Sequence, residues 1–189
     1  MAHVRASWAS AADLWEELGK VHEKEGETSR ALDAFGGAAQ CYKRAKMFEQ
    51  AFDMYTERGR IAFGARSYAD AARVYKEGHR ILCLSYGMCR PFRGGDHLGP
   101  LTIVRAALCH MATSEWPEAR AVLDSPEDPG RGWGRSSLRA TLKQICDEFQ
   151  LKKFDVAREL IKKVELPWNM TAEEKRVFSD LGKDAPAKA

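Results

Sequence analysis

The stretch FEQAFDMYTERGRIAFGARSYADAARVY, residues 48–75, contains one eight-residue pattern twice. In FEQAFDMY and again in YADAARVY, an aromatic residue stands three positions before an alanine, and a tyrosine stands four positions after it. Offsets of three and four place these residues on one face of an α-helix, and a small alanine lets a neighbouring helix approach closely. The stretch therefore predicts two amphipathic helices that pack through a small residue.

The same pattern recurs elsewhere in the chain. It is centred on Ala119 in WPEARAVL, and weaker copies are centred on Ala31 and Ala157. Ala31, Ala51 and Ala71 stand twenty residues apart, a spacing that fits one helix and its turn. Since a single helix cannot bury its own apolar face, antiparallel stacking of these helices predicts an all-α, tetratricopeptide (TPR)-like solenoid of helix pairs.

The first predicted helix pair also fits the tetratricopeptide signature. The matching residues of its two helices are Trp15, Leu18, Gly19 and His22, followed by Ala31, Phe35 and Ala38. Part of the signature returns forty residues later, at Tyr55, Gly59, Ala71 and Tyr75. This period is longer than the 34 residues of a regular tetratricopeptide repeat, so we predict a related but irregular array.

Helix start signals divide the chain into about nine helices without a strand. SAAD at Ser10 and TAEE at Thr171 are predicted capping boxes, Ser114 and Ser136 or Ser137 are predicted N-caps, and Pro100 suits a first helical turn. The predicted helices cover roughly residues 10–24, 28–44, 48–63, 67–86, 100–112, 115–124, 137–150, 152–165 and 172–181. We predict a single helical-repeat domain over residues 1–182 and a flexible C-terminal tail over residues 183–189.

The composition indicates a soluble, intracellular globular protein. The chain has 189 residues, of which 44% are hydrophobic and 30% charged, and it contains neither a signal-peptide pattern nor a run of 18 uncharged apolar residues. Its five cysteines, Cys41, Cys83, Cys89, Cys109 and Cys146, form no CxxC pair, and three of them lie in apolar helical patterns. We predict buried, reduced thiols and a cytoplasmic chain with at most peripheral membrane association.

The segment GRGWGRSS, residues 130–137, is where a phosphate-binding loop would be sought. It lacks the lysine of GxxxxGK[ST], its three glycines alternate strictly, and Asp124, Glu127 and Asp128 just before it would repel phosphate. We therefore predict a connector between helices. Neither HExxH nor a nucleophile elbow occurs, and His79 and His110 lie in helical patterns without an acidic or cysteine partner at ligand spacing, so we expect no enzyme, cofactor or metal site.

Basic residues concentrate in the middle of the chain. Residues 43–93 contain eleven Lys and Arg against five Asp and Glu, a net charge of +6, whereas residues 1–42 carry −3. In the helix predicted over 67–86, Arg73, Lys76 and Arg80 lie opposite the packing face. This pattern is typical of either a solvated face or an electrostatic docking surface for an acidic helical partner. The predicted partner-binding residues are Lys43, Arg44, Lys46, Arg66, Arg73, Lys76, Arg80, Arg90 and Arg93.

Three segments resemble the soluble NSF attachment proteins, and the gamma type more than the alpha type. They are AADLWEELGKVHEKEGETSRALDAFGGAAQCYKRAKMFEQAFDMY, then RAALCHMATSEWPEARAVL, and finally SSLRATLKQICDEFQ with LKKFDVARELI. The resemblance implies an adaptor that lies along the four-helix SNARE bundle and recruits the hexameric ATPase NSF, which disassembles the bundle after membrane fusion. The adaptor itself would catalyse nothing.

Three alternatives stay open at this stage. A helical-repeat subunit that serves as a scaffold inside a larger assembly is the main one, because each end of a solenoid exposes an apolar edge that needs a cap. A chaperone-tail adaptor of the tetratricopeptide kind is the second. Nucleic acid is a third, which we do not expect as a partner because a net charge of +3 falls short of a typical binding footprint.

Overall fold

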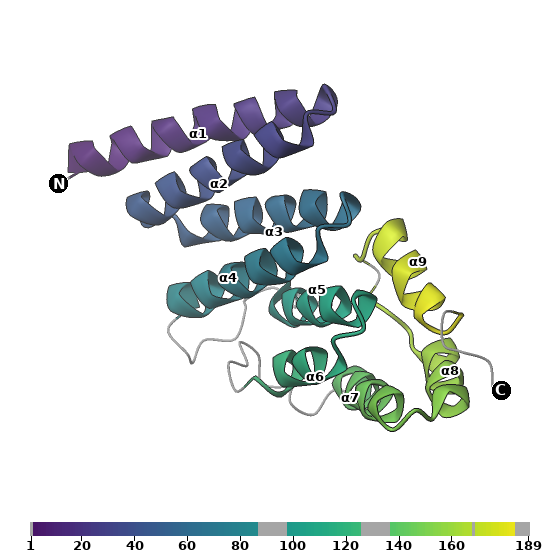
Figure 1. The fold of residues 1–189 in the computed structure, drawn as a ribbon. Coiled ribbons are helices and arrows are strands. Elements are labelled where there is room, and N and C mark those ends of the chain that lie inside the picture. Colours follow the sequence, from purple (N-terminus) through teal and green to yellow (C-terminus); the bar gives the residue numbers. More distant parts are fainter. Residues whose placement is uncertain (1, 87–97, 126–136, 168, 184–189) are drawn as a thin grey trace. The chain divides into compact units, whose positions relative to one another are not determined.

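The computed structural model describes residues 2–86, 98–125, 137–167 and 169–183, and these form nine α-helices without a strand (Figure 1). The chain divides into two compact units, residues 1–90 and 91–189. The all-helical, TPR-like fold is thus confirmed, while the single domain over residues 1–182 stays a prediction. The helices are α1 (Ala2–Lys24), α2 (Thr28–Ala45), α3 (Phe48–Gly64), α4 (Tyr68–Tyr86), α5 (Leu98–Ala112), α6 (Trp116–Asp124), α7 (Ser137–Gln150), α8 (Phe154–Lys163) and α9 (Ala172–Leu181).

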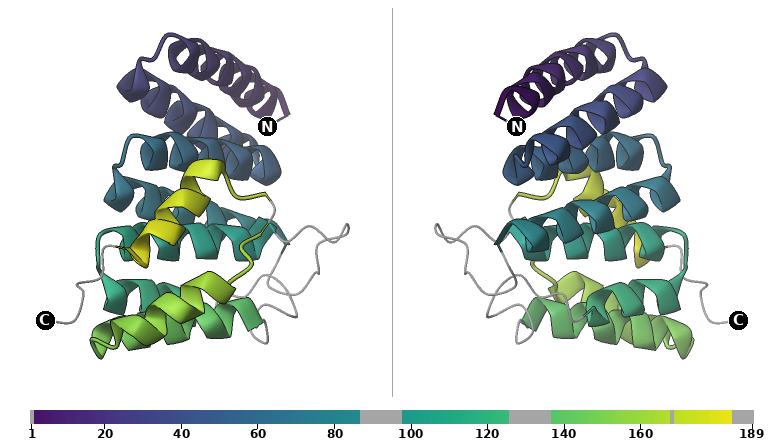
Figure 2. Two further views of the ribbon diagram at one scale, coloured as in Figure 1. Left: turned by 90° about the vertical axis from the view of Figure 1, so that its right-hand side faces the viewer. Right: turned by 90° about the vertical axis from the view of Figure 1, so that its left-hand side faces the viewer.

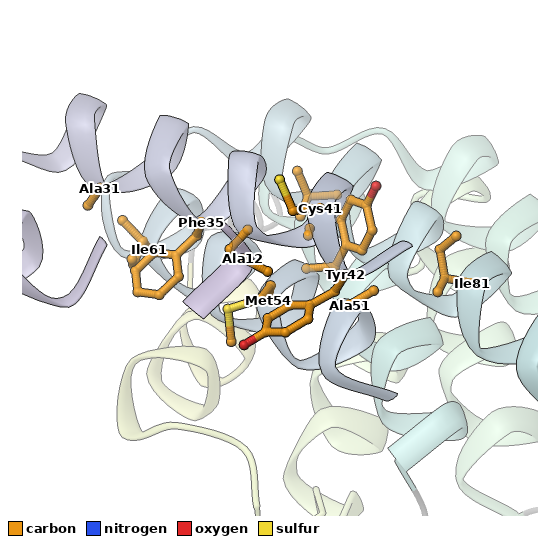
Figure 3. Close-up of a cluster of buried hydrophobic side chains, with 13 residues drawn as sticks. Ala12, Ala31, Phe35, Cys41, Tyr42, Ala51, Met54, Ile61 and Ile81 are labelled. Carbon is orange, nitrogen blue, oxygen red and sulfur yellow. The ribbon is translucent and has the colours of Figure 1, made fainter. Parts of the chain in front are cut away.

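In the first unit, α1 to α4 pack consecutively, each against the next (Figures 1 and 2). Their shared core contains Phe35 and Tyr42 of α2 together with Met54 of α3 and Ala12 of α1 (Figure 3). Each of these side chains is at most 6% exposed. The apolar faces predicted from the three-and-four spacing therefore meet along the stack.

Five turns between consecutive helices share one backbone geometry. Their central residues have positive φ angles of 58° to 75°, and the following N–H donates to the carbonyl five residues earlier at 2.8–2.9 Å. This is the Schellman arrangement, which satisfies the last carbonyls of a helix and favours glycine at its centre. The central residues are Gly26, Lys46, Arg66, Ser114 and Lys152.

An alanine stands five residues after each of these turn centres. The five alanines are fully buried, and their N–H groups donate to the carbonyls four residues earlier, which begins the hydrogen-bonding ladder of the next helix. A methyl group in that first turn permits close contact with the preceding helix. These residues, predicted as the centres of the recurrent pattern, are Ala31, Ala51, Ala71, Ala119 and Ala157.

Glycine and tyrosine interlock where α3 crosses α4. A Cβ atom built on Gly59 would lie 2.5 Å from the Tyr75 ring, and one built on Gly78 would lie 3.0 Å from Cβ of Tyr55. Tyr75 is fully buried and Tyr55 is 3% exposed. Each tyrosine thus occupies the space that the missing side chain of the facing glycine leaves, so these two glycines are required by packing.

In the second unit, α5 to α8 again pack consecutively, and α9 contacts both α5 and α8. Trp116 of α6 stacks on Phe149 of α7 with ring centroids 3.9 Å apart, and Phe154 of α8 meets Phe149 edge-on at 5.9 Å. Helix α5 is the most buried of the unit, since Leu101 to Cys109 are all at most 6% exposed.

A buried ion pair joins α9 to α5. Arg105 Nε lies 2.8 Å from Glu174 Oε1, and the two side chains are 8% and 1% exposed. Glu174 also accepts the Thr171 backbone N–H at 2.7 Å, and its own N–H donates to the Thr171 hydroxyl, which completes a capping box. The capping box predicted at TAEE is confirmed, and it delivers its glutamate to a buried arginine.

Several predicted helix ends are wrong. Helix α1 begins at Ala2 instead of residue 10, so Ser10 is inside a helix and caps nothing. Ser114 is also no N-cap, because it occupies the left-handed turn and Glu115 precedes α6. For the same reason α8 starts at Phe154, after the left-handed Lys152. The glycine-rich connector falls at residues 126–136, outside the described residues.

The Gly59–Tyr75 contact predicts that Gly59→Ala destabilises the protein. Its methyl group would overlap the buried ring, and overpacking costs about 1–3 kcal/mol, which outweighs the better helix propensity of alanine. Urea unfolding followed by circular dichroism measures this change. Gly64→Ala is the matched control, because nothing lies within 4 Å of its Cβ position, and an equal effect of both substitutions would contradict the contact.

The buried pair predicts that Glu174→Ala lowers the free energy of unfolding by about 3–5 kcal/mol, because Arg105 would be left buried without its carboxylate. Glu173→Ala, one residue earlier, removes an exposed pair with Arg176 and should cost below about 1 kcal/mol. Chemical denaturation of both variants makes the comparison. Similar losses would show that the buried pair does not hold α9.

Candidate partner-binding surface

Seven of the nine predicted partner-binding residues lie in the first unit, where their side chains are described. They come from the end of α2, the turn before α4 and α4 itself. Arg90 and Arg93 fall outside the described residues. The seven are Lys43, Arg44, Lys46, Arg66, Arg73, Lys76 and Arg80.

Helix α4 presents its basic residues on one side and its packing residues on the other. Arg73, Lys76 and Arg80 are exposed, at offsets of three and four, whereas Ala71 and Tyr75 are fully buried. Offsets of three and four align the three cations along one face. The helix packs through its alanine and tyrosine, and this fixes the direction in which the cations point.

A shared carboxylate brings α2 and α4 together on this surface. Glu77 accepts from Arg80 at 2.7 and 2.8 Å, and Lys43 Nζ lies 3.4 Å from Glu77 Oε1. These two cations hold the pKa of the Glu77 carboxyl below its ordinary value, the Arg80 hydrogen bonds being the larger cause. Lys43 and Arg80 are therefore neighbours, although 37 positions separate them in the sequence.

A second carboxylate pairs with the cation at the start of α4. Asp70 accepts from Arg73 at 2.9 Å and from the Ser67 hydroxyl at 3.0 Å, and both bonds lower the pKa of its carboxyl. Both members of the Asp70–Arg73 pair are more than half exposed. Exposed pairs contribute only about 0–1 kcal/mol, so a carboxylate of a partner can replace Asp70 at little cost.

The remaining three cations extend or leave this surface. Lys46 is the C-cap residue of α2 and Arg66 is in the turn before α4, and both have positive φ angles and exposed side chains. Within α4, Arg73 and Arg80 are separated by roughly 10 Å along the helix axis, at 1.5 Å per residue. Arg44 instead lies over the Trp8 ring of α1, with its guanidinium carbon 4.5 Å from the ring centroid. The other six, which we name the basic strip, are Arg66, Arg73, Lys76, Arg80, Lys43 and Lys46.

One exposed feature of α1 was missed in the sequence. Five large apolar side chains are 41% to 73% exposed on this helix, and they are Val4, Leu14, Trp15, Leu18 and Val21. Leu14, Leu18 and Val21 follow offsets of four and three, so they share a face. That spacing was visible in the sequence, but nothing local distinguishes a face that packs from one that stays open.

Among the described residues, His22, Glu25 and Glu27 form a group that could hold a metal ion, since one ligand atom from each lies within 4.8 Å of the others. His22 Nδ1 is 2.6 Å from Glu27 and 3.7 Å from Glu25. However, Arg30 donates to both Glu27 oxygens at 2.9 and 3.0 Å and lowers the pKa of that carboxyl. An ion would have to compete with this guanidinium, so the arrangement favours ion pairing.

Comparison with known proteins gives one family. The sequence model of the soluble NSF attachment protein family, SNAP, matches residues 3–82. No curated protein matches the chain significantly. Among the described residues, no helix has the length and apolarity needed to cross a membrane.

The left-handed geometry of the turns can be tested by glycine substitution. Lys46→Gly and Arg66→Gly should each stabilise the protein by about 1 kcal/mol, because a Cβ atom at positive φ costs roughly that much more than glycine. Lys76→Gly, in the exposed middle of α4, should cost about 1 kcal/mol instead. Thermal unfolding gives both signs, and destabilisation by the turn substitutions would contradict the assigned geometry.

Proposed function

We propose that this chain, whose residues 3–82 match the sequence model of the soluble NSF attachment protein family, is a non-enzymatic adaptor that binds the SNARE helical bundle and links it to the ATPase NSF. One observation carries the proposal: the family match contains the whole basic strip, from Lys43 to Arg80. The adaptor would act in vesicle-mediated transport, in the cytoplasm and peripherally at membranes. The gamma-type subfamily is part of the same proposal.

The charges of the strip suit a long acidic partner. Six cations lie on α4, in the turn before it and at the end of α2, and the carboxylates of Asp70 and Glu77 neutralise only part of their charge. A parallel row of Asp and Glu on a helical bundle would meet these cations over several helical turns. Because the side chains are exposed, their attraction is screened beyond about 8 Å at physiological salt, so binding should be salt-sensitive.

No catalytic step is assigned to the chain in this proposal. The basic strip would bind and orient the SNARE bundle, and the energy for disassembling the bundle would come from the partner ATPase. The packed helices of the first unit hold the strip in place, since its cations stand on helices whose opposite faces are buried. Binding therefore needs little reordering of the backbone.

Co-sedimentation with an assembled SNARE bundle tests the proposal. The triple variant Arg73→Glu, Lys76→Glu, Arg80→Glu should lower the affinity at least tenfold, or about 1.4 kcal/mol, because it reverses the charge of the strip. Wild-type binding should weaken as salt is raised. NSF should join the pellet only when both the bundle and the wild-type chain are present.

The matched control is Lys152→Glu, Lys153→Glu, Arg176→Glu, which makes the same change in net charge on exposed residues of the second unit. It should bind the bundle like the wild type. Circular dichroism of both variants checks that the helices persist. Equal binding by the wild type and the strip variant would sink the proposal.

A scaffold subunit of a larger assembly is the second candidate function. The exposed apolar side chains of α1 favour it, since an unpaired apolar helix face is what a neighbouring subunit would cover. Binding through that face would persist at high salt. Leu14→Glu with Leu18→Glu should then release the partners, while the charge-reversed strip variant should retain them, the opposite of the adaptor outcome.

A further inference from the structure

A groove in the second unit lies outside the residues that match the family. It has a volume of about 620 Å³ and is formed by α8, α9 and the segment between them. Its apolar lining comes from Ile161, Val164, Leu166 and Phe178, of which Ile161 and Phe178 are 7% and 4% exposed. This volume lies within the range of sites that bind small molecules or anchoring side chains.

Basic side chains surround this apolar lining. Arg158 and Lys162 approach from α8, and Lys175 and Lys183 from α9 and its end. Glu165 is the one acidic residue among the lining residues that the structure describes, so their net charge is +3. Apolar surface enclosed by cations is complementary to a ligand that carries an apolar group between negative charges.

The cations of the groove differ in how firmly they are held. Lys162 and Lys183 are 69% and 72% exposed, and each pairs at 2.7 Å with the acidic residue three positions before it, Glu159 or Asp180. Exposed pairs of this kind are weak and exchange readily. Arg158 is more buried, and its Nε donates to the Gly182 carbonyl at 2.8 Å, which ties α8 to the end of α9.

The walls of the groove are fixed by the rest of the unit. Helix α9 is held by the buried Arg105–Glu174 pair and its capping box. Helix α8 is anchored by Ala157 and by the Phe149–Phe154 contact with α7. A groove with fixed walls needs no ordering when a ligand enters, which favours binding.

From these observations we infer that the α8–α9 groove is a second protein-docking site, which takes an acidic peptide segment with a large apolar anchor residue. The anchor side chain fits against Ile161 and Phe178. Carboxylates on either side of it reach Lys162 on α8 and Lys183 beyond α9. Because cations stand on both helices, an extended or helical segment with acids flanking the anchor matches the groove better than a single anionic group does.

Gly182 offers a way to block the groove without disturbing its walls. A Cβ atom there would make ordinary contacts of 3.8 Å with Arg158 and Ile161, and the backbone has helical angles of −74° and −20°. Gly182→Leu therefore places a side chain beside these lining residues, whereas Gly182→Ala adds one methyl group. The pair separates steric blocking from a general effect of losing glycine.

Selection from a random peptide phage-display library on the full chain tests the inference. The enriched peptides should contain a large apolar residue flanked by Asp or Glu. A fluorescein-labelled copy of one enriched peptide should bind Gly182→Leu at least tenfold more weakly by anisotropy, and Gly182→Ala like the wild type. Lys162→Glu with Lys183→Glu should also lose at least tenfold, whereas Lys152→Glu with Lys153→Glu should not.

Three results would overturn the inference. One is enrichment of peptides without acidic residues, or no enrichment at all. Another is unchanged peptide affinity in both the Gly182→Leu variant and the Lys162→Glu, Lys183→Glu variant. If Gly182→Leu fails to fold, the lysine variant alone decides the test. The third is binding of the full chain to phosphatidylserine vesicles that Gly182→Leu abolishes, without peptide binding, which would assign the groove to lipid. None of these variants touches the basic strip, so their outcome is independent of SNARE-bundle binding.

Discussion

Close approach of neighbouring helices through a small residue is the constraint on which the rest of the structure depends. Five buried alanines occupy the first turn of their helices, each five residues after a left-handed turn centre. A larger side chain there would push the preceding helix away and open the core. The turn fixes where the next helix starts, and the alanine fixes which of its faces turns inward.

The position of the basic strip follows from this packing. Ala71 and Tyr75 face the core, so Arg73, Lys76 and Arg80 must face outward. Lys43 reaches the same surface from α2 because α2 and α4 both pack on α3, and Glu77 joins the two. The proposed function would therefore use the side of each helix that the packing leaves exposed. In the second unit, α8 and α9 leave a groove between them.

The sequence predicted the helices well because their packing pattern is local. The twenty-residue spacing of Ala31, Ala51 and Ala71 was enough to predict the helices, the turns between them and their antiparallel packing. The capping box at Thr171 was also visible in the sequence, as TAEE. The left-handed residues at Lys46 and Arg66 were not predictable, because a lysine or arginine carries none of the preference of glycine for positive φ. The start of α1 was predicted too late because SAAD at Ser10 matches the sequence pattern of a capping box, although Ser10 lies inside the helix.

Features that depend on distant residues could not be predicted from the sequence. Arg105 and Glu174 are 69 positions apart, and no local pattern marks either as buried. The residues of the basic strip were predicted from the sequence, but their arrangement in space was not. Glu77 brings Lys43 of α2 beside Arg80 of α4, and Arg44 lies over the Trp8 ring instead. The α8–α9 groove likewise needs the positions of both helices and of the segment between them.

Zero-length carbodiimide cross-linking of the intact chain to an assembled SNARE bundle would show directly whether the basic strip binds the bundle. This chemistry joins only lysines and carboxylates in contact, and mass spectrometry identifies the linked residues. We expect links from Lys43, Lys46 and Lys76 to acidic residues of the bundle, and we expect high salt to abolish them. Links confined to Lys152, Lys153 or Lys175, with the strip lysines unmodified, would contradict this expectation.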